Sequence, residues 1–237
     1  MILLIRRKWV LSAATLLLIV VSFLPLTEQP RAAIPAFSYD ALPIKEVVII
    51  DAGHGGSDGG AVSADGTPES GINLAIALRL RDFLALMGCQ TVLTRTGETS
   101  LADPDSGTLR KEKVSDTKNR VALINSVANG FLISIHQNTL PGHPNVHGAQ
   151  AFYGKVPDSD ARAAAIQQTL NDTVNPENEK VSKPIGSDIY IMAHAECPAV
   201  LIECGFLSNS NETAMLLTPE YQTKLTAAIG CGYPQYQ

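Results

Sequence analysis

A strand-like run that ends in a glycine-rich turn constrains the fold of this chain most. The segment Val47–Ala61 reads VVIIDAGHGGSDGGA, with four β-branched residues, an aspartate, and then a turn that contains one histidine, His54. A continuous apolar run of this kind is typical of a strand buried on both faces, as in parallel sheets. Open sheets of that type build their sites beyond the carboxyl ends of the strands. We therefore expect His54 to lie at a functional edge.

Strand-like runs alternate with helical patterns along the rest of the chain. The helical pattern is clearest over 70–87, where apolar residues repeat on one face and Gly88 follows as a stop. The first strand is predicted over 46–51, and the other strands over 90–94, 131–136, 148–153, 189–192 and 199–204. Further helices are predicted over 116–126, 158–174, 212–217 and 219–229. This alternation predicts a single α/β domain with a mostly parallel central sheet flanked by helices.

The N-terminus has the composition of an export signal. Arg6, Arg7 and Lys8 precede Trp9–Leu26, an uncharged run of 18 residues. This run is longer than the ~7–15 apolar residues of a cleavable signal and near the lower limit for a membrane-spanning helix. No clear A-x-A site follows, so the pattern favours a signal anchor over 1–26, with a cleaved signal peptide as the alternative. Either one places the folded part outside the cytoplasm.

The remaining chain has the length of one domain and an acidic charge. Residues 27–43 form a linker that contains proline and alanine, and 44–237 is enough for one well-cored catalytic domain. The whole chain has a formal charge of −5, and the first 40 residues hold four basic and two acidic side chains, so the remainder has a charge of −7. Such a domain has no electrostatic reason to bind nucleic acid. The membrane segment is the expected means of holding it near a substrate.

Two further strands end in side chains that can bind metal or transfer protons. His136 ends the run FLISIH, and Glu203 lies near the end of AVLIEC. Together with His54, these side chains look like one constellation at the ends of three strands. Glu69 ends the glycine-rich loop just before the helix predicted over 70–87, where a carboxylate also suits the positive end of the helix dipole.

Two histidines and one carboxylate suit a catalytic zinc ion that keeps a fourth position for water. We therefore predict that His54, Glu69 and His136 bind one Zn²⁺ ion, with other divalent ions left open. Glu203, beside the ion but not on it, is predicted to take a proton from water and pass it to the leaving nitrogen of an amide. His147, beside a proline-containing loop, is the reserve ligand.

Each of these assignments has a structural alternative. His54 and His136 are also compatible with histidines that only bond local backbone or end a strand. Glu69 could serve the helix alone, and Glu203 could pair with a lysine or arginine. A glutamate inside AVLIEC is costly to bury, which favours a functional reason for Glu203.

Four segments, in family order, resemble the zinc-dependent N-acetylmuramoyl-L-alanine amidases of the bacterial cell wall. They are DAGHGGSDGGA, ESGINLAIALRLRDFL, LISIHQN and PAVLIECGFLSN, so the resemblance runs from about Val47 to the C-terminus. It implies that His54, Glu69 and His136 bind zinc and that Glu203 is the catalytic glutamate. The implied reaction cuts the amide between the lactyl group of N-acetylmuramic acid and L-alanine in peptidoglycan. The anchor and the segment GAQAFYGK also look like the sporulation and germination branch, which implies action on spore cortex and muramic-lactam formation.

Some residues of the resemblance concern the substrate rather than the metal. Asn138 matches a family position near the site and is predicted to contact substrate. Gln137 and Thr139 replace small residues that are frequent in the family pattern, which affects substrate-side contacts. Cys204 stands where valine or a small residue is frequent, and the change should be neutral.

Two other functions stay open at the level of sequence. A zinc carboxypeptidase or endopeptidase acting on stem peptides would need a cation for a peptide carboxylate, and Arg95 and Arg120 are the candidates. A non-catalytic, membrane-tethered wall-binding module would keep the metal without the chemistry, although the presence of Glu203 argues against it. The sequence identifies no accessory protein.

Overall fold

The computed structural model describes residues 45–104 and 107–233. The predicted N-terminal signal or anchor and the predicted linker lie outside these residues. Among the helices within the described ranges, none has the length and apolar character needed to cross a membrane.

The centre of the domain is a six-stranded sheet in the order β2-β1-β3-β6-β4-β5. The strands β2, β1, β3 and β6 run parallel, whereas β4 runs antiparallel to β6 and pairs in parallel with the short β5. The prediction of a mostly parallel sheet is confirmed. The strands are β1 (Val47–Ala52), β2 (Gln90–Leu93), β3 (Gly130–Asn138), β4 (Gln150–Tyr153), β5 (Lys183–Pro184) and β6 (Ala199–Phe206).

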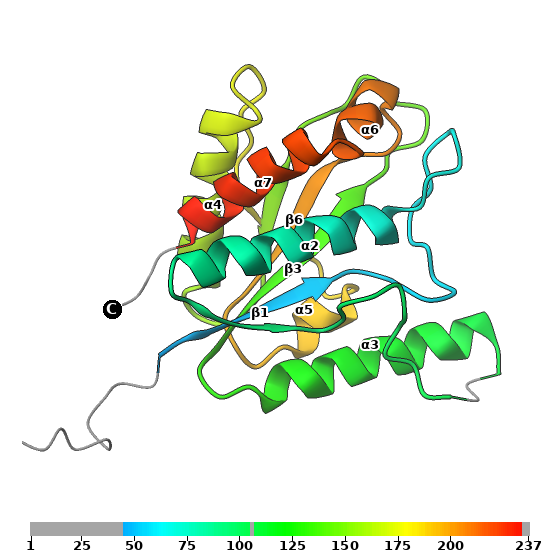
Figure 1. Cartoon of the computed structure of the whole chain (residues 1–237), viewed down its shortest axis with the longest axis vertical. Helices are drawn as coiled ribbons and strands as arrows, with labels where there is room; N and C mark the ends of the chain where they lie inside the picture. The colour runs from blue at the N-terminus through cyan, green and yellow to red at the C-terminus, as the bar shows by residue number, and fades with distance from the viewer. Residues whose placement is uncertain (1–44, 105–106, 234–237) are drawn as a thin grey trace, which may run out of the picture. The chain divides into compact units, whose positions relative to one another are not determined.

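Helices cover both faces of this sheet. On one face lie α2 (Glu69–Leu86), α4 (Ser159–Thr173) and α7 (Pro219–Gly232), whose apolar side chains share one core with the strands. On the other face lie α3 (Leu109–Ser126) and α5 (Tyr190–His194), which share a smaller core. Figure 1 shows α2 and α7 in front of the strands and α3 along the lower edge. The short α6 (Ser210–Leu216) follows β6.

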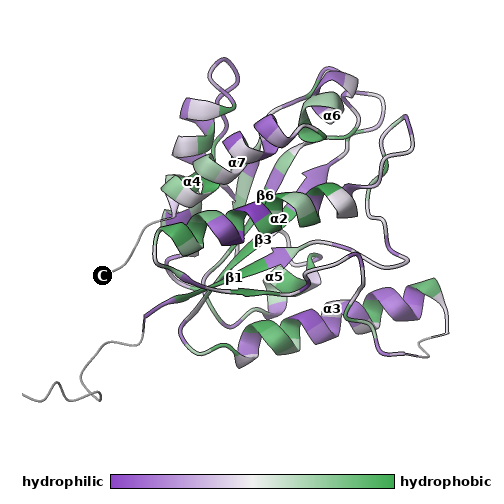
Figure 2. Ribbon diagram, viewed as in Figure 1, coloured by the Kyte–Doolittle hydropathy of each residue, from purple (hydrophilic) through white to green (hydrophobic). Residues whose placement is uncertain are grey.

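The alternation of side chains along the strands explains why both faces need cover. Ile49 and Leu132 point into the smaller core, whereas Val48, Ile50 and Ile133 point into the larger one, and all five are fully buried. Successive residues of a strand face opposite sides of the sheet, so a run that is apolar throughout needs helices on both sides. In Figure 2 the hydrophobic colouring gathers on β1, β3 and α2.

The predicted strand over 189–192 is wrong. The chain forms the helix α5 there, and the ring of Tyr190 stacks on that of His194 with centroids 3.9 Å apart, the i, i+4 spacing of a helix. A short apolar run does not by itself distinguish a strand from a buried helical turn. The last strand position is filled instead by β5, in a stretch for which the sequence predicts no strand.

Candidate metal centre

The four predicted metal and catalytic side chains lie together at the carboxyl ends of the parallel strands. His54 follows β1 with a left-handed backbone (φ 60°), and Glu69 is the first residue of α2. His136 and Glu203 are paired register positions on the neighbouring strands β3 and β6. Strand order therefore brings together residues that are far apart in sequence, at the edge where open α/β sheets bind ligands.

Three of these side chains bring their donor atoms close enough together to hold a metal ion. One nitrogen each from His54 and His136 and one oxygen of Glu69 lie within 4.8 Å of one another. His54 Nε2 contacts Glu69 Oε1, and His136 Nδ1 lies 3.5 Å from that same oxygen. The ligand atoms of a tetrahedral zinc site, about 2.1 Å from the ion, are about 3.4 Å apart. The His136–Glu69 pair already has that spacing.

Two glycines make room for these ligands. A β-carbon on Gly53 would overlap the ring of His136, with Nδ1 at 2.7 Å. A β-carbon on Gly60, which has a left-handed φ of 73°, would overlap Glu69, with Cδ at 2.6 Å. These positions therefore need glycine for close approach, and the glycine-rich turn is part of the construction of the site.

The imidazole and carboxylate groups shift one another's protonation. Although burial alone would lower it, contact with Glu69 and with Asp58 raises the pKa of His54 to about 9. Burial alone would raise the pKa of Glu69, yet the nearby His136 and His54 lower it to about 2. A proton on the imidazole thus balances the buried carboxylate in the protein alone. A divalent cation at this position would replace that proton, and its binding would weaken as the pH falls.

Glu203 is the carboxylate without a local partner. Its Oε2 atom is buried and has no hydrogen-bond partner among the residues that the structure describes. Burial raises the pKa of Glu203 to about 7. The adjacent Ile202 and Cys204 are fully buried on the opposite face of β6. Among the described residues, no lysine or arginine pairs with Glu203, so the structural alternative finds no support.

The four side chains open into a groove of 490 Å³. Its floor is formed by the ends of β3 and β6, and its rim includes Thr117 of α3 and the partly exposed Ile189 and Tyr190 at the start of α5. Asn138 and Thr139 line the groove as well. Asn138 Oδ1 accepts a hydrogen bond from the backbone of Thr139 (2.7 Å).

Two of the residues that depart from the family pattern, Gln137 and Cys204, point to the face of the sheet that α2 covers. The Gln137 side chain is buried and donates to Asn73 (3.1 Å), and its Oε1 atom has no hydrogen-bond partner among the described residues. Asn73 in turn donates to the carbonyl of Gly53 (3.2 Å), and the backbone of Gln137 donates to Glu69 Oε2 (3.2 Å). Gln137 therefore helps to hold Glu69 and, through Asn73, the backbone of Gly53 in place beside the candidate metal ligands.

The arginines considered for a peptide carboxylate are used by the fold. Arg95 is buried and donates to the carbonyls of Ala52, Gly53 and Ser70 (2.7–3.1 Å). Arg120 is 1% exposed and donates to Asp51 and to the carbonyl of His54. Both hold the backbone around the turn, and this removes the cation on which the carboxypeptidase alternative relied.

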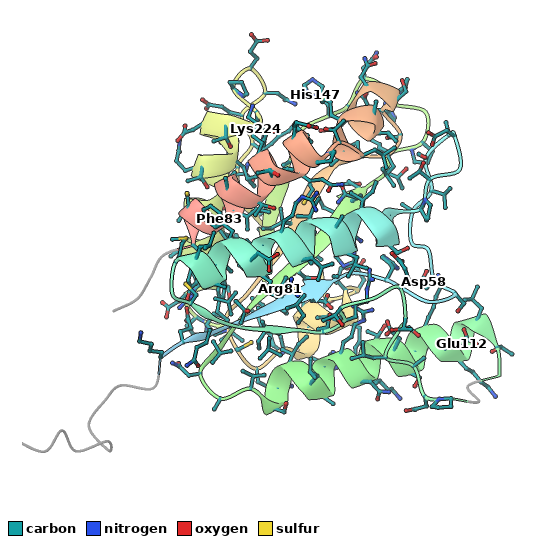
Figure 3. All side chains as sticks on the ribbon, in the orientation of Figure 1. Asp58, Arg81, Phe83, Glu112, His147 and Lys224 are labelled. Carbon is teal, nitrogen blue, oxygen red and sulfur yellow. The ribbon has the colours of Figure 1, made fainter. Side chains whose placement is uncertain are left out.

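The reserve ligand His147 is not brought to the site. It bonds Asn178 through its ring and its carbonyl, and Figure 3 shows it well away from Asp58 of the glycine-rich turn. Two residues near the site were not predicted from the sequence: Asn73, one turn after Glu69, and Asp58, whose carboxylate contacts His54 (2.8 Å). The position of Asp58, four residues after the candidate ligand His54, is the sequence feature that could have indicated this contact.

Comparisons with known proteins agree with this geometry. The family model for N-acetylmuramoyl-L-alanine amidases matches residues 48–232. The chain belongs to this family. The match covers nearly all of the described domain, including all four residues of the cluster.

Relatives of this amidase come from several bacteria. The germination-specific N-acetylmuramoyl-L-alanine amidase of Bacillus subtilis is 36% identical over 198 residues, which cover 83% of this chain and 82% of the relative. The amidase AmiA of Escherichia coli is 26% identical over 81% of this chain and 76% of its own length. Among solved structures, the CwlD amidase of Clostridioides difficile, in complex with the GerS lipoprotein, has a TM-score of 0.76 and 39% identity over 80% of this chain and 96% of that one.

Proposed function

We propose that this amidase hydrolyses the bond between the lactyl group of N-acetylmuramic acid and L-alanine, with one zinc ion held by His54, Glu69 and His136. The observation that carries the proposal is the convergence of three ligand atoms within 4.8 Å at an open groove, next to a buried carboxylate that has no partner among the described residues. A ligating set with an adjacent proton-transfer group is what metal-assisted amide hydrolysis needs.

The donor set suits zinc. Two imidazoles and one carboxylate are the protein ligands of known zinc peptidases, and the fourth position stays open for water or substrate. The described residues around the site offer no cage of carboxylates, which would favour magnesium, calcium or manganese. When bound, zinc supplies Lewis-acid chemistry, since it polarises a carbonyl oxygen and lowers the pKa of water to about 7.

Glu203 performs the proton transfer in this proposal. With its pKa raised by burial to about 7, the carboxylate can take a proton from the attacking water near neutral pH and later return it to the leaving nitrogen of alanine. The Asn138 amide at the groove rim donates a hydrogen bond to the substrate. The groove opens at the surface of the domain, as cleavage of a branched polymer requires.

The cellular setting is part of the same proposal. Similarity to the germination-specific relative favours spore cortex as the substrate and muramic-lactam formation as the consequence of the cut. We propose that the protein acts outside the cytoplasm and that the apolar segment within 1–26 anchors it to the membrane. The linker over 27–43 then gives the catalytic domain of 44–237 its reach.

Fragment analysis of digested peptidoglycan tests the reaction. Purified cortex and vegetative sacculi are incubated with the protein, once with added zinc and once with chelator, and the soluble products are examined by mass spectrometry. We expect intact stem peptides with a free alanine amino group, and glycan with a free lactyl carboxylate, only in the presence of zinc. Peptides cut within the stem would favour the endopeptidase alternative, and binding without any products would favour the wall-binding module.

A further inference from the structure

The side chain of Asp58 lies against the side of the His54 ring that faces away from Glu69. Its Oδ2 atom is 2.8 Å from His54 Nδ1, while His54 Nε2 contacts Glu69. An ionised carboxylate only accepts hydrogen bonds, so this contact places a proton on Nδ1. When a cation replaces the proton between Nε2 and Glu69, the lone pair of the neutral ring lies on Nε2, the atom that faces the metal cluster.

Asp58 is itself held in place from several directions. Its backbone exchanges two hydrogen bonds with Gly55 (2.9 and 3.1 Å), and its Oδ1 accepts from the backbone of Gly60 (3.1 Å). Lys113 of α3 places its Nζ atom 2.7 Å from that same Oδ1. The Asp58 side chain is 16% exposed and that of Lys113 is 47% exposed. Asp58 is thus a fixed acceptor, and Lys113 reaches it from the surface.

A second contact joins the same turn to the same helix. The hydroxyl of Ser57 donates to Glu112, the residue before Lys113. In Figure 3, Asp58 lies near the end of α3 that carries Glu112. The first turns of α3 therefore hold the turn that carries His54 through two neighbouring side-chain contacts.

The two histidines of the cluster differ in how much support they need. His136 lies within β3 and is held by the ladders to its neighbours. His54 lies in a turn, with a left-handed backbone that non-glycine residues rarely adopt. Apart from Glu69, the structure gives His136 no carboxylate at ion-pair distance among the described residues, whereas His54 has Asp58.

We infer that Asp58 is a positioning residue that fixes the ring and tautomer of His54 for metal binding, and that Lys113 supports Asp58 from α3. The inference rests on the metal site proposed above. Carboxylates that accept from the second nitrogen of a ligating histidine orient the ring and strengthen it as a ligand. The expected consequence is on zinc affinity, ahead of any effect on the reaction.

Zinc affinity of the full-length protein, purified in detergent and measured by competition with a chromophoric chelator, tests this inference. We expect Asp58→Ala to weaken zinc binding by about 10–100-fold. Asp58→Asn keeps an acceptor at the same place and should bind zinc more tightly than Asp58→Ala. Lys113→Met should weaken binding by about two- to fivefold, because the ion pair is half exposed. Lys111→Met, on the same helix turn and exposed to solvent, is the matched control and should leave the affinity unchanged.

Two further measurements separate positioning from folding. The unfolding temperature in chelator should be the same for all four variants and the unmodified protein. The visible absorption of the Co²⁺-loaded protein, which reports ligand geometry, should change for Asp58→Ala and stay the same for Lys111→Met. Zinc affinity of Asp58→Ala within twofold of the unmodified protein would overturn the inference, as would an Asp58→Asn variant that binds no better than Asp58→Ala.

His54→Ala tells the two proposals apart. If His54→Ala binds zinc as tightly as the unmodified protein, the metal site itself is wrong. If His54→Ala loses zinc while Asp58→Ala keeps it, only the positioning role is wrong. Equal weakening by Lys111→Met and Lys113→Met would indicate a general effect of charge and would overturn the role of Lys113.

Discussion

Two buried clusters of charged side chains adjoin the end of β1, and they are built in opposite ways. The metal cluster contains His54, Glu69, His136 and Glu203, and the arginine cluster contains Asp51, Thr94, Asp116, Arg120 and Ser134. In the arginine cluster every carboxylate oxygen of Asp51 is used, with Oδ1 accepting from Arg120 (2.7 Å) and Thr94 (2.8 Å) and Oδ2 from Ser134 (2.7 Å). In the metal cluster, Glu203 Oε2 has no partner among the described residues.

This difference distinguishes a cluster that stabilises the fold, the arginine cluster, from one that is available for binding and chemistry, the metal cluster. Buried charges are stable when each is paired and hydrogen-bonded, and a buried polar atom without a partner is costly. Arg120 also bonds Asp116 (2.8 Å) and the carbonyl of His54 (2.6 Å), so the complete cluster fixes the backbone that presents the incomplete one. We expect changes in the metal cluster to affect chemistry and changes in the arginine cluster to affect folding.

The largest expected effect is on turnover in the Glu203→Gln variant. Glutamine has the same shape but cannot accept the proton, so amide cleavage should fall by about 10²–10⁴-fold. Zinc content, measured by atomic absorption, and the free energy of unfolding should stay close to those of the unmodified protein. Turnover within tenfold of the unmodified enzyme would remove Glu203 from the reaction.

The arginine cluster should respond in the opposite way. Arg120→Met leaves Asp51 buried without its cation, and loss of one partner of such a pair costs about 3–5 kcal/mol of unfolding free energy. Urea denaturation measures this, with Arg81→Met as the control, because the Arg81–Asp82 pair is exposed and its loss should have little effect. Equal stability of the two variants would mean that the arginine cluster is not the scaffold.

The sequence predicted the metal cluster better than the arginine cluster, and the reason is physical. His54, His136 and Glu203 were predicted from their positions at strand ends. Buried strands can be recognised in the sequence as apolar runs, and the carboxyl ends of parallel strands meet at one edge of the sheet. Arg120 was considered for substrate, since nothing local in its helix indicates that it reaches Asp51, 69 positions earlier. Contacts between side chains of distant elements depend on packing that no periodicity reports.

The secondary structure was likewise predicted where a long local pattern determines it, and was not predicted elsewhere. The parallel core and α2 were predicted, because long periodic segments specify their own element type. The helix α5 was predicted as a strand, since its five residues are too few to show a period. The antiparallel direction of β4 was also not predicted, because direction depends on how the connection crosses the sheet.

Substitution of a glycine in the turn beside the metal cluster should have a smaller effect, and this effect is on zinc affinity. Gly60 and Gly66 both have a left-handed backbone (φ 73° and 88°), but only at Gly60 would a β-carbon overlap Glu69. Gly66→Ala should therefore cost only backbone strain of about 1 kcal/mol and keep its zinc affinity. Gly60→Ala should have that strain and also lose about 10–100-fold in zinc affinity, the range found when the support of a metal ligand is disturbed.

Titration with zinc and denaturation in chelator measure the two effects of these variants separately. The informative quantity is the difference in zinc affinity between Gly60→Ala and Gly66→Ala, because both substitutions introduce the same backbone strain. Zinc affinity that falls equally in Gly60→Ala and Gly66→Ala would mean that the flexibility of the turn, and not the space for Glu69, controls the site.

The smallest expected effect is the part of the acid dependence of stability that Asp51 of the arginine cluster contributes. Burial alone would raise the pKa of Asp51, but Arg120 and His136, with help from Ser134 and Thr94, hold it below its usual value. A group whose pKa is lowered by folding stabilises the protein above its unfolded pKa of about 3.9 and loses that contribution as the pH falls through the folded value. The unfolding free energy should therefore decline below about pH 4.

Urea denaturation between pH 7 and pH 2, in chelator so that no metal contributes, measures this decline. Asp51→Asn has no proton to gain at this position, so its curve should lie lower at pH 7 and converge with that of the unmodified protein as the pH falls. Ser134→Ala removes one hydrogen bond to the ionised Asp51, which raises its folded pKa towards the unfolded value, so the acid-dependent loss of stability should be smaller and should end at a higher pH. Parallel curves for Asp51→Asn and the unmodified protein would show that Asp51 is not ionised in the fold, and the arginine cluster would then lack the charge pairing that distinguishes it from the metal cluster.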